Sequence, residues 1–461
     1  MRKSLVTMVS AAVLLTGCAV KVPAPTSALP TAQALSSSFV HDDPFEAEWW
    51  RQFQDPALAA LITDAGEATR DLQAAAARVV AARELAGATR LNLLPTGGVG
   101  VSVSRQHASE FEVRGLDLPT RTGTAYRTGI DVAWEADVFG RVRGRTRAAE
   151  ADAVAAAMDA RGVQVAIVAQ VASAYYDWLG AQRDLDLLAS LRQQVQELIT
   201  KTAALIEAGR LTRLDLLRVQ QLDDGMAVEQ ALARHAGERA RLRLATLTGR
   251  SPDGWSVPTT PAAPLRAQQL PIGRMADVLP RRPDVGVAHA RLDAALARAG
   301  VARAELLPRV DVVGSFGLVA GRLGSLAEAG ALSWLAAPRM AWSFLDWPQL
   351  RRRARAAGAL ADAAFAEYEQ ATLRALEEVR VAVDGYGAAT DRLVATQRQF
   401  DAAADVAGIV TVQYQEGLVD SLARTLAERD RIVGQLAASR ALTAHQQAVV
   451  DVYRALGGGW R

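Results

Sequence analysis

The side chains of this sequence that could perform catalysis or bind a metal are few and widely separated. The chain has a single cysteine, Cys18, so a disulfide within the chain is excluded. Its five histidines show no mutual spacing typical of metal ligands. They are His41, His107, His235, His289 and His445. No nucleophile with its base, and no carboxylate pair, lies at an interpretable spacing, so we expect no catalytic site, no metal site and no cofactor.

The cysteine follows the pattern of a secretory signal. A basic start and an apolar run over residues 5–15 precede it, and this run is too short to span a bilayer. Residues 15–18, Leu-Thr-Gly-Cys, resemble the lipobox of bacterial lipoproteins. The resemblance implies that Cys18 becomes the N-terminus and carries a diacylglyceryl and an N-acyl group. Because residue 19 is not Asp, it also implies sorting to the outer membrane. The alternative for Cys18 is a buried, inert thiol.

Charge gives little information about partners. The 461 residues include 52 basic and 50 acidic side chains, with a formal net charge of +2. This balance provides no bulk attraction for nucleic acid, and we expect no nucleic-acid partner.

Two stretches, each with a pair of segments that alternate like β-strands, interrupt an otherwise helical sequence. In residues 127–135, Thr128, Ile130, Val132 and Trp134 alternate with charged or small residues. Residues 99–104, 309–318 and 339–344 alternate in the same way, and the last of these includes Met340, Trp342 and Phe344. Aliphatic and aromatic residues on one face, with Arg, Asp and Glu on the other, are typical of membrane strands around a wet lumen.

The two halves of the chain repeat one pattern. The Leu-Leu-Pro ends of two helical runs differ by 308 − 95 = 213, the strand tryptophans by 342 − 134 = 208, and the helix-breaking glycines by 417 − 209 = 208. We therefore predict an internal duplication in which each half is a helix, two strands, a long helix, a turn and a return helix.

This pattern divides the chain into consecutive segments. They are a signal peptide (1–17), a lipidated extended tether (18–44), first-repeat helices (45–95), a first β-hairpin (96–139), a long helix with a turn at Gly209 and a return helix (140–250), a linker (251–272), second-repeat helices (273–308), a second β-hairpin (309–347), and a long helix with a turn at Gly417, a return helix and the C-terminus (348–461).

Four strands cannot close a membrane barrel, because known barrels begin at eight strands. Three copies would supply twelve. The predicted fold is therefore mainly α with a membrane β-barrel part: a long α-helical coiled-coil tunnel plus four strands per protomer, with a trimer closing a 12-stranded barrel.

The chain resembles the TolC-like outer-membrane factors, specifically the OprM-like efflux lipoproteins, over essentially its whole length. The most specific pieces are residues 49–56, residues 77–79 leading to the Leu-Pro at 94–95, residues 279–284 (Leu-Pro-Arg-Arg-Pro-Asp) and residues 453–460. The resemblance implies a trimeric channel-tunnel in the outer membrane of a Gram-negative cell that extends into the periplasm. It would accept drugs or other small molecules from an inner-membrane pump of the resistance-nodulation-division class through a periplasmic adaptor.

In that family the periplasmic ends of the helix pairs form the gate and dock the adaptor. The corresponding docking turns here are Gly209, Arg210, Leu211, Thr212, Gly417, Leu418 and Val419. The first tip matches the family's glycine followed by Leu-Asp-x-Leu. The second departs from it, with Arg-Thr-Leu at 424–426 in place of Val-Leu-Asp. The gate candidates are Arg213, Asp215, Asp420 and Arg424, because charges repeated around a narrow axis create a strong field. The alternative to a gate role is that these four residues lie on a solvated tip, where their ion pairs are weak.

One aromatic cluster and one basic run could be taken for binding sites. We expect Tyr175, Tyr176 and Trp178 to pack in a helix layer and not to bind a ligand. The basic run of residues 351–353 follows a strand end, so we expect it to meet the membrane interface or neighbouring acids.

Two other functions compete with a channel. A lipid-anchored periplasmic coiled-coil adaptor or scaffold would explain the lipobox and the helices, but not the two strand pairs. A lipoprotein hydrolase would need a catalytic set that the sequence does not show.

Overall fold

The chain was examined as a computed structural model. The residues that the structure describes are 22–23, 40–41, 48–109, 111, 122–258, 270–271 and 275–458. The predicted signal peptide, Cys18 and most of the predicted tether lie outside them, as does the middle of the linker. Two compact units are formed: segments 78–156 and 287–369 contribute to unit 1, and segments 29–77, 157–286 and 370–461 contribute to unit 2.

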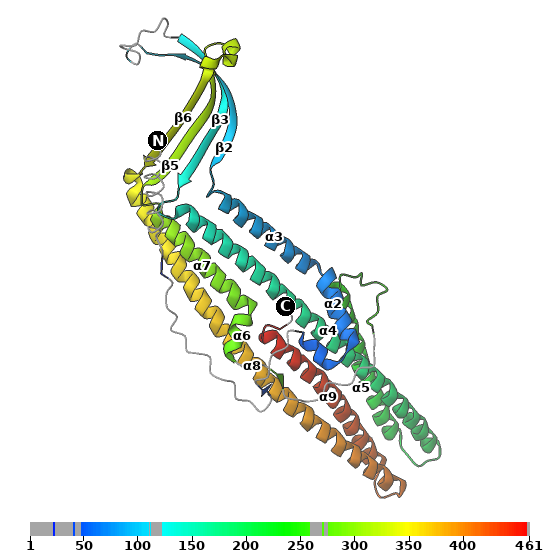
Figure 1. The fold of residues 1–461 in the computed structure, drawn as a ribbon. Coiled ribbons are helices and arrows are strands. Elements are labelled where there is room, and N and C mark those ends of the chain that lie inside the picture. Colours follow the sequence, from blue (N-terminus) through cyan, green and yellow to red (C-terminus); the bar gives the residue numbers. More distant parts are fainter. Residues whose placement is uncertain are drawn as a thin grey trace. The chain divides into compact units, whose positions relative to one another are not determined.

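Unit 1 contains one antiparallel sheet in the order β2-β3-β5-β6 (Figure 1). Its strands are β2 (Thr96–His107), β3 (Thr122–Ala136), β5 (Arg309–Ala320) and β6 (Leu332–Ala341). The two hairpins of the internal repeat therefore join side by side through β3 and β5. The outer edges of β2 and β6 have no strand partner among the described residues, so the sheet is open on both sides.

The end of β6 differs from the prediction. We expected alternation to continue through residue 344, but the strand ends at Ala341 and residues Phe344–Asp346 form a 3-10 turn, η4. The amide of Asp346 donates to the carbonyl of Ser343 at 3.1 Å. The next helix begins at once, with Pro348 in its first turn, where proline is favoured. The chain must therefore leave the strand before residue 344.

The long predicted helices are present. The helices of the two repeats are α2 (Pro56–Ala68), α3 (Arg70–Leu91), α4 (Arg141–Glu207), α5 (Arg213–Leu247), α6 (Met275–Arg281), α7 (Pro283–Ala304), α8 (Trp347–Gln415) and α9 (Ser421–Ala455). The 67 residues of α4 give a length of about 100 Å. One window of α4 is apolar enough to cross a membrane by composition alone. Val171 and Tyr175 of this helix are fully buried in unit 2.

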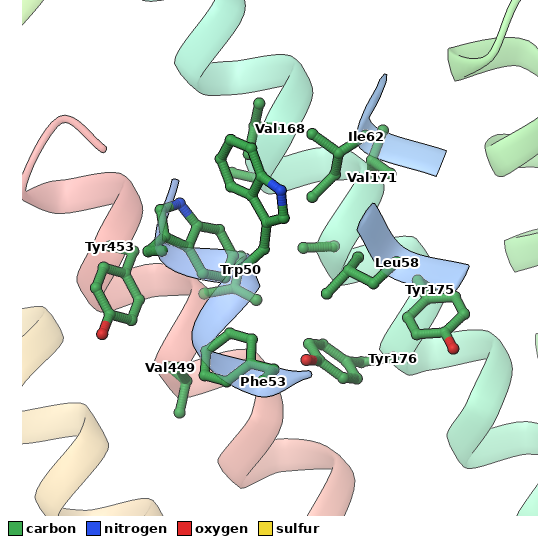
Figure 2. Packing of buried hydrophobic residues seen from close by; sticks show 14 of the residues in the cluster. Trp50, Phe53, Leu58, Ile62, Val168, Val171, Tyr175, Tyr176, Val449 and Tyr453 are labelled. Carbon is green, nitrogen blue, oxygen red and sulfur yellow. The ribbon is translucent and has the colours of Figure 1, made fainter. Parts of the chain in front are cut away.

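The core of unit 2 forms around a short 3-10 helix, η1 (Trp49–Phe53). Its aromatic side chains pack with residues of α2, α4 and α9, drawn in blue, teal and red (Figure 2). The ring of Trp49 stacks on Tyr453 of α9, with 4.9 Å between centroids. Tyr175 and Tyr176 are buried in the same cluster, which confirms that they pack in the core.

Asp55 caps the start of α2. Its carboxylate accepts hydrogen bonds from the amides of Ala57 and Leu58, at 3.0 and 3.1 Å. The hydroxyl of Tyr175 donates to the other carboxylate oxygen at 2.9 Å. One buried side chain therefore caps α2 and joins it to α4.

Arg282 connects the start of α7 to the C-terminal helix in unit 2. Its guanidinium is 7% exposed and donates to Asp284, Glu378 and the carbonyl of Ala455, at 2.7, 2.6 and 2.8 Å. A buried guanidinium is tolerated when its donors are used in this way. Residues 279–284 and the segment near 455, both cited for the family resemblance, thus meet in space.

A short strand pair was not predicted. β1 (Val40–His41) pairs in parallel with β4 (Leu270–Pro271), where we expected only a tether and a linker. Backbone amides and carbonyls need partners when a segment lies against the fold, and two extended segments supply them to each other. Neither segment has the alternation that would have indicated a strand.

Candidate functional site

Both predicted turns end a long helix with a left-handed glycine. Gly209 has φ +72° and Gly417 has φ +74°, a conformation that side chains with a Cβ rarely adopt. The residue after each glycine donates its amide to a carbonyl of the preceding helix at 2.8 Å. These bonds run from Arg210 to Leu205 and from Leu418 to Gln413. The two tips are therefore built alike.

Asp215 links the two tips of unit 2. Its carboxylate accepts from the amide and the hydroxyl of Thr212, at 2.9 and 2.7 Å, within a capping box at the start of α5. Its other oxygen accepts from the hydroxyl of Ser421, the first residue of α9, at 2.6 Å. Arg218 lies 3.8 Å away. The start of α5 is thereby held against the start of α9.

These hydrogen bonds favour the ionised carboxylate. The hydroxyl of Ser421 is the largest cause that lowers the pKa of Asp215, followed by the hydroxyl and the amide of Thr212. Partial burial acts in the opposite direction, and the net result is a pKa of about 2. Asp215 therefore carries a full negative charge at neutral pH.

The other three gate candidates do not join Asp215 in one cluster. Asp420 caps α9 by accepting from the amide of Ala423 at 2.8 Å. The guanidinium of Arg424 lies over the ring of Tyr414 on α8, 5.1 Å from its centroid. The side chain of Arg213 is exposed and has no hydrogen bond or ion pair within the described part of the chain. Within one chain, the side-chain hydrogen bond between the two tips joins Asp215 to Ser421.

Sequence reasoning missed Ser421. The offset of 208 places Asp420 opposite Thr212 and Ala423 opposite Asp215, so the second tip has its carboxylate at the cap position. The one signal for Ser421 was a hydroxyl directly after that cap. Its contact with Asp215 depends on how the tips approach each other, which spacing along the chain does not reveal.

The polar face of the sheet carries paired charges where strands meet helices. Asp311 on β5 is buried and accepts from Arg309 at 3.0 Å and Arg339 at 3.3 Å. Glu135 at the end of β3 pairs with Arg141 at the start of α4. Such a face suits water, since it carries charged side chains, and the partially buried ones, Asp311 and Glu135, are paired with arginines.

The opposite face of the sheet is apolar. Ile130 pairs in register with Val99 and with Phe316, and Phe316 pairs with Trp334. All four side chains are exposed, between 49% and 80%. A row of exposed aliphatic and aromatic residues is typical of a surface covered by lipid or by another chain.

The histidines do not form a metal centre. His445 is fully buried, and neither ring nitrogen has a hydrogen-bond partner. Burial lowers its pKa, so the ring is held neutral. Among the described residues, no group of three or more His, Cys, Asp or Glu is placed to hold a metal ion.

Comparison with known proteins decides the family. The sequence model of the outer membrane efflux protein family matches residues 61–250 and 275–458. The chain belongs to this family. The efflux protein is 30% identical over 421 residues to SepC of Pseudomonas putida, a probable efflux pump outer membrane protein, covering 90% of this chain and 86% of SepC. It is also 30% identical over 423 residues to the outer membrane protein OprJ of Pseudomonas aeruginosa, covering 89% and 86%.

A comparison with solved structures supports the same family. The outer-membrane channel OprN superposes with a TM-score of 0.87 at 34% identity, covering 95% of this chain and 99% of OprN. The efflux protein is thus an outer-membrane channel-tunnel of mainly helical fold with a few antiparallel strands, and its family and relatives are transport proteins. The predicted fold class and channel function are confirmed, and the adaptor or scaffold alternative is wrong. Barrel closure is not achieved by one chain.

Proposed function

We propose that the efflux protein works as a lipid-anchored homotrimer that passively conducts small molecules from an inner-membrane pump and a periplasmic adaptor to the exterior. The observation that carries this proposal is the open four-stranded sheet with one polar and one apolar face. Each hairpin of this sheet leads directly into a helix of 67 or 69 residues.

The open edges support oligomerisation. An unpaired strand edge in a membrane leaves amides and carbonyls without partners, which costs several kcal/mol per group. Joining β6 of one copy to β2 of the next satisfies both edges. Three copies give twelve strands, above the minimum of eight for a membrane barrel.

The partners are inferred from the relatives. SepC carries the name of an efflux pump outer membrane protein, which supports an efflux pump as a partner. The resistance-nodulation-division class of this pump and the periplasmic adaptor are what the resemblance to the OprM-like lipoproteins implies. We place adaptor docking at the exposed turns around Gly209 and Gly417, because their backbones leave side chains such as Leu418, 73% exposed, available for contact. A buried, fully satisfied turn would not serve this purpose.

The gate is assigned to the same tips. In a trimer, three copies of the Asp215–Ser421 contact would surround one axis, and each holds α5 against α9 with a charge-assisted hydrogen bond. Breaking it frees the tip to open. Asp420, Arg424 and Arg213 would shape the field around this opening.

The lipid anchor is assigned to Cys18, which lies outside the described residues. Its support is the lipobox pattern of residues 15–18. Diacylglyceryl and N-acyl chains would supply apolar contacts with the bilayer in addition to those of the sheet.

The channel proposal is tested with purified protein in detergent. Light scattering coupled to size-exclusion chromatography should give the mass of three chains, and addition to planar bilayers should raise conductance in discrete steps. A monodisperse monomer that leaves the bilayer silent would disprove the proposal. Addition of a purified adaptor should raise the conductance further if it opens the tips.

A further inference from the structure

We infer that the beginning of α8 is a binding site for the phosphate headgroup of an anionic phospholipid in the periplasmic leaflet of the outer membrane. The site, called here the α8 basic patch, consists of Trp347, Arg351, Arg352 and Arg355. All four side chains are exposed. This inference concerns the lipid around the channel and is separate from the small molecules that pass through it.

The arginines of the α8 basic patch form no ion pair with any acid among the described residues. In the described part of the structure, none of the three has an ion pair or hydrogen bond from its side chain. The guanidinium of Arg351 lies over the indole of Trp347, 5.2 Å from its centroid. At about 100° per residue, Arg351 and Arg355 lie on one side of the helix, and Arg352 adjoins them. These donors form one surface.

The equivalent start of α4 in the first repeat is different. It also carries several arginines, but three of them pair inside unit 1. The pairs are Arg141 with Glu135, Arg143 with Asp137, and Arg145 with Glu305. The duplication therefore placed basic residues at both helix starts. Among the described residues, Arg147 is the one arginine of this α4 set without an acid, whereas on α8 none of Arg351, Arg352 and Arg355 has one. A partner from outside the chain can supply the missing negative charge.

The electrostatic potential at the start of α8 is positive, which favours a negatively charged partner. The first turn of α8 contains no acidic residue, but the carboxylate of Asp346 directly precedes the helix and offsets part of its positive end. Three arginines in the following turns add positive potential beyond this single acid. An anion at this point would therefore be attracted mainly by the arginine side chains.

The aromatic residues beside the patch indicate that this anion is a lipid. Trp342, Phe344, Leu345 and Trp347 are between 41% and 81% exposed at the point where β6 leads into α8. Tryptophan and other aromatic residues gather at the depth of lipid headgroups in membrane barrels. Arginines one or two turns beyond such a belt lie at the level of the phosphates. A lipid would contact both groups, whereas a soluble phosphate would contact the arginines alone.

The test counts lipids bound to the detergent-purified protein by native mass spectrometry. Dioleoyl-phosphatidylglycerol and dioleoyl-phosphatidylcholine are offered separately, at equal concentration. The wild type should retain the anionic lipid in preference to phosphatidylcholine. Arg351→Gln/Arg352→Gln/Arg355→Gln should lower the affinity for phosphatidylglycerol about tenfold or more, since each basic residue near an anionic surface contributes about fivefold.

A matched control comes from the same helix. Arg380→Gln/Arg392→Gln/Arg398→Gln removes the same charge from exposed α8 side chains of unit 2 that also have no partner among the described residues. This variant should bind phosphatidylglycerol like the wild type. Raising the salt from 0.1 to about 0.5 M should weaken the preference of the wild type, because screening shortens the reach of the charges.

Several results would overturn the inference. Equal retention of phosphatidylglycerol by wild type and patch variant would do so, as would equal binding of glycerol phosphate and the lipid. The triple variant could also lose its oligomers while each chain binds as much lipid as before. This result would show that the patch contacts another copy of the chain instead of lipid. If the triple variant does not assemble, the single change Arg352→Gln and the lipid preference of the wild type decide the question.

Discussion

The indole N–H of Trp134 donates a hydrogen bond to the backbone carbonyl of Leu93, 2.9 Å away. The second repeat has the same contact, from Trp342 to the carbonyl of Leu306 at 3.1 Å. In each case the end of a return strand is joined to the turn between a helix end and a Leu-Pro, where the backbone carbonyl lies beyond the hydrogen bonds of the helix. The duplication thus conserved a link between strand and helix, and not only the order of elements.

These links should stabilise the junctions. Trp134→Phe and Trp342→Phe keep most of the apolar surface and remove the N–H, so each should lower the free energy of unfolding by about 1 kcal/mol. Thermal unfolding in detergent measures the effect. Trp334→Phe is the control, since Trp334 is 71% exposed and its indole has no hydrogen bond within the described chain. An equal loss in all three variants would contradict the prediction.

The contact between Asp215 and Ser421 should hold the tip closed. Ser421→Ala removes the donor, and Asp215→Asn removes the charge, so each should raise basal conductance in planar bilayers. Because both changes break one interaction, the double variant should conduct no more than the stronger single variant. Fully additive effects would show that the two residues act separately.

The same contact predicts a dependence on pH. Asp215 has a pKa lowered from 3.8 to about 2, so its ionised form stabilises the folded tip above about pH 4. This stability is lost as the pH falls from about 4 to about 2, and basal conductance should rise in that window. Asp215→Asn should show no such transition. A wild-type channel with constant conductance over the window would exclude this carboxylate as a latch.

The glycines of the two turns should resist substitution. A Cβ at Gly209 or Gly417 meets no atom within 4 Å, so the cost of alanine comes from the positive φ alone, about 1–2 kcal/mol. Gly225 lies within α5 with equally open space and no positive φ, and Gly225→Ala should stabilise by about 0.5–1 kcal/mol. Thermal unfolding of the three variants should give opposite signs for the turn and helix positions.

Arg282 and Arg374 line one cavity in unit 2, and Arg282 should be the more sensitive of the two to substitution. Arg282→Met leaves the carbonyl of Ala455 without its buried donor and should destabilise unit 2 by about 1–3 kcal/mol. Arg374→Met is the control, because Arg374 lines the same cavity but is exposed and unpaired in the described chain. Urea unfolding followed by the fluorescence of Trp49 and Trp50 measures both; similar midpoints would be evidence against the role of Arg282.

The anchor prediction concerns Cys18. Cys18→Ala should abolish incorporation of labelled palmitate but leave the protein in the outer membrane, because trimeric barrel insertion should outweigh one lipidated terminus. Fractionation of labelled cells measures both outcomes. Complete release of the variant from the membrane would contradict the second expectation.

Sequence alone determined the long helices, the four strands of the sheet and their order, but not the short pair β1 and β4. The alternation around Ile130 and Phe316, the capping residue Asp55 and the turn glycine Gly209 were all readable, because periodicity, capping and left-handed turns are local properties. The end of β6 was misread, since alternation through Phe344 competed with a helix start that Pro348 favoured.

Tertiary structure alone decided which distant side chains meet. Ser421 reaches Asp215 across 206 positions of sequence. Arg282 reaches Glu378 across 96 positions. Neither contact has a local signature, because it depends on how long helices lie against one another. The arginines at the two helix starts looked alike in sequence, but packing supplied acids to three of those on α4 and left Arg351, Arg352 and Arg355 of α8 unpaired among the described residues.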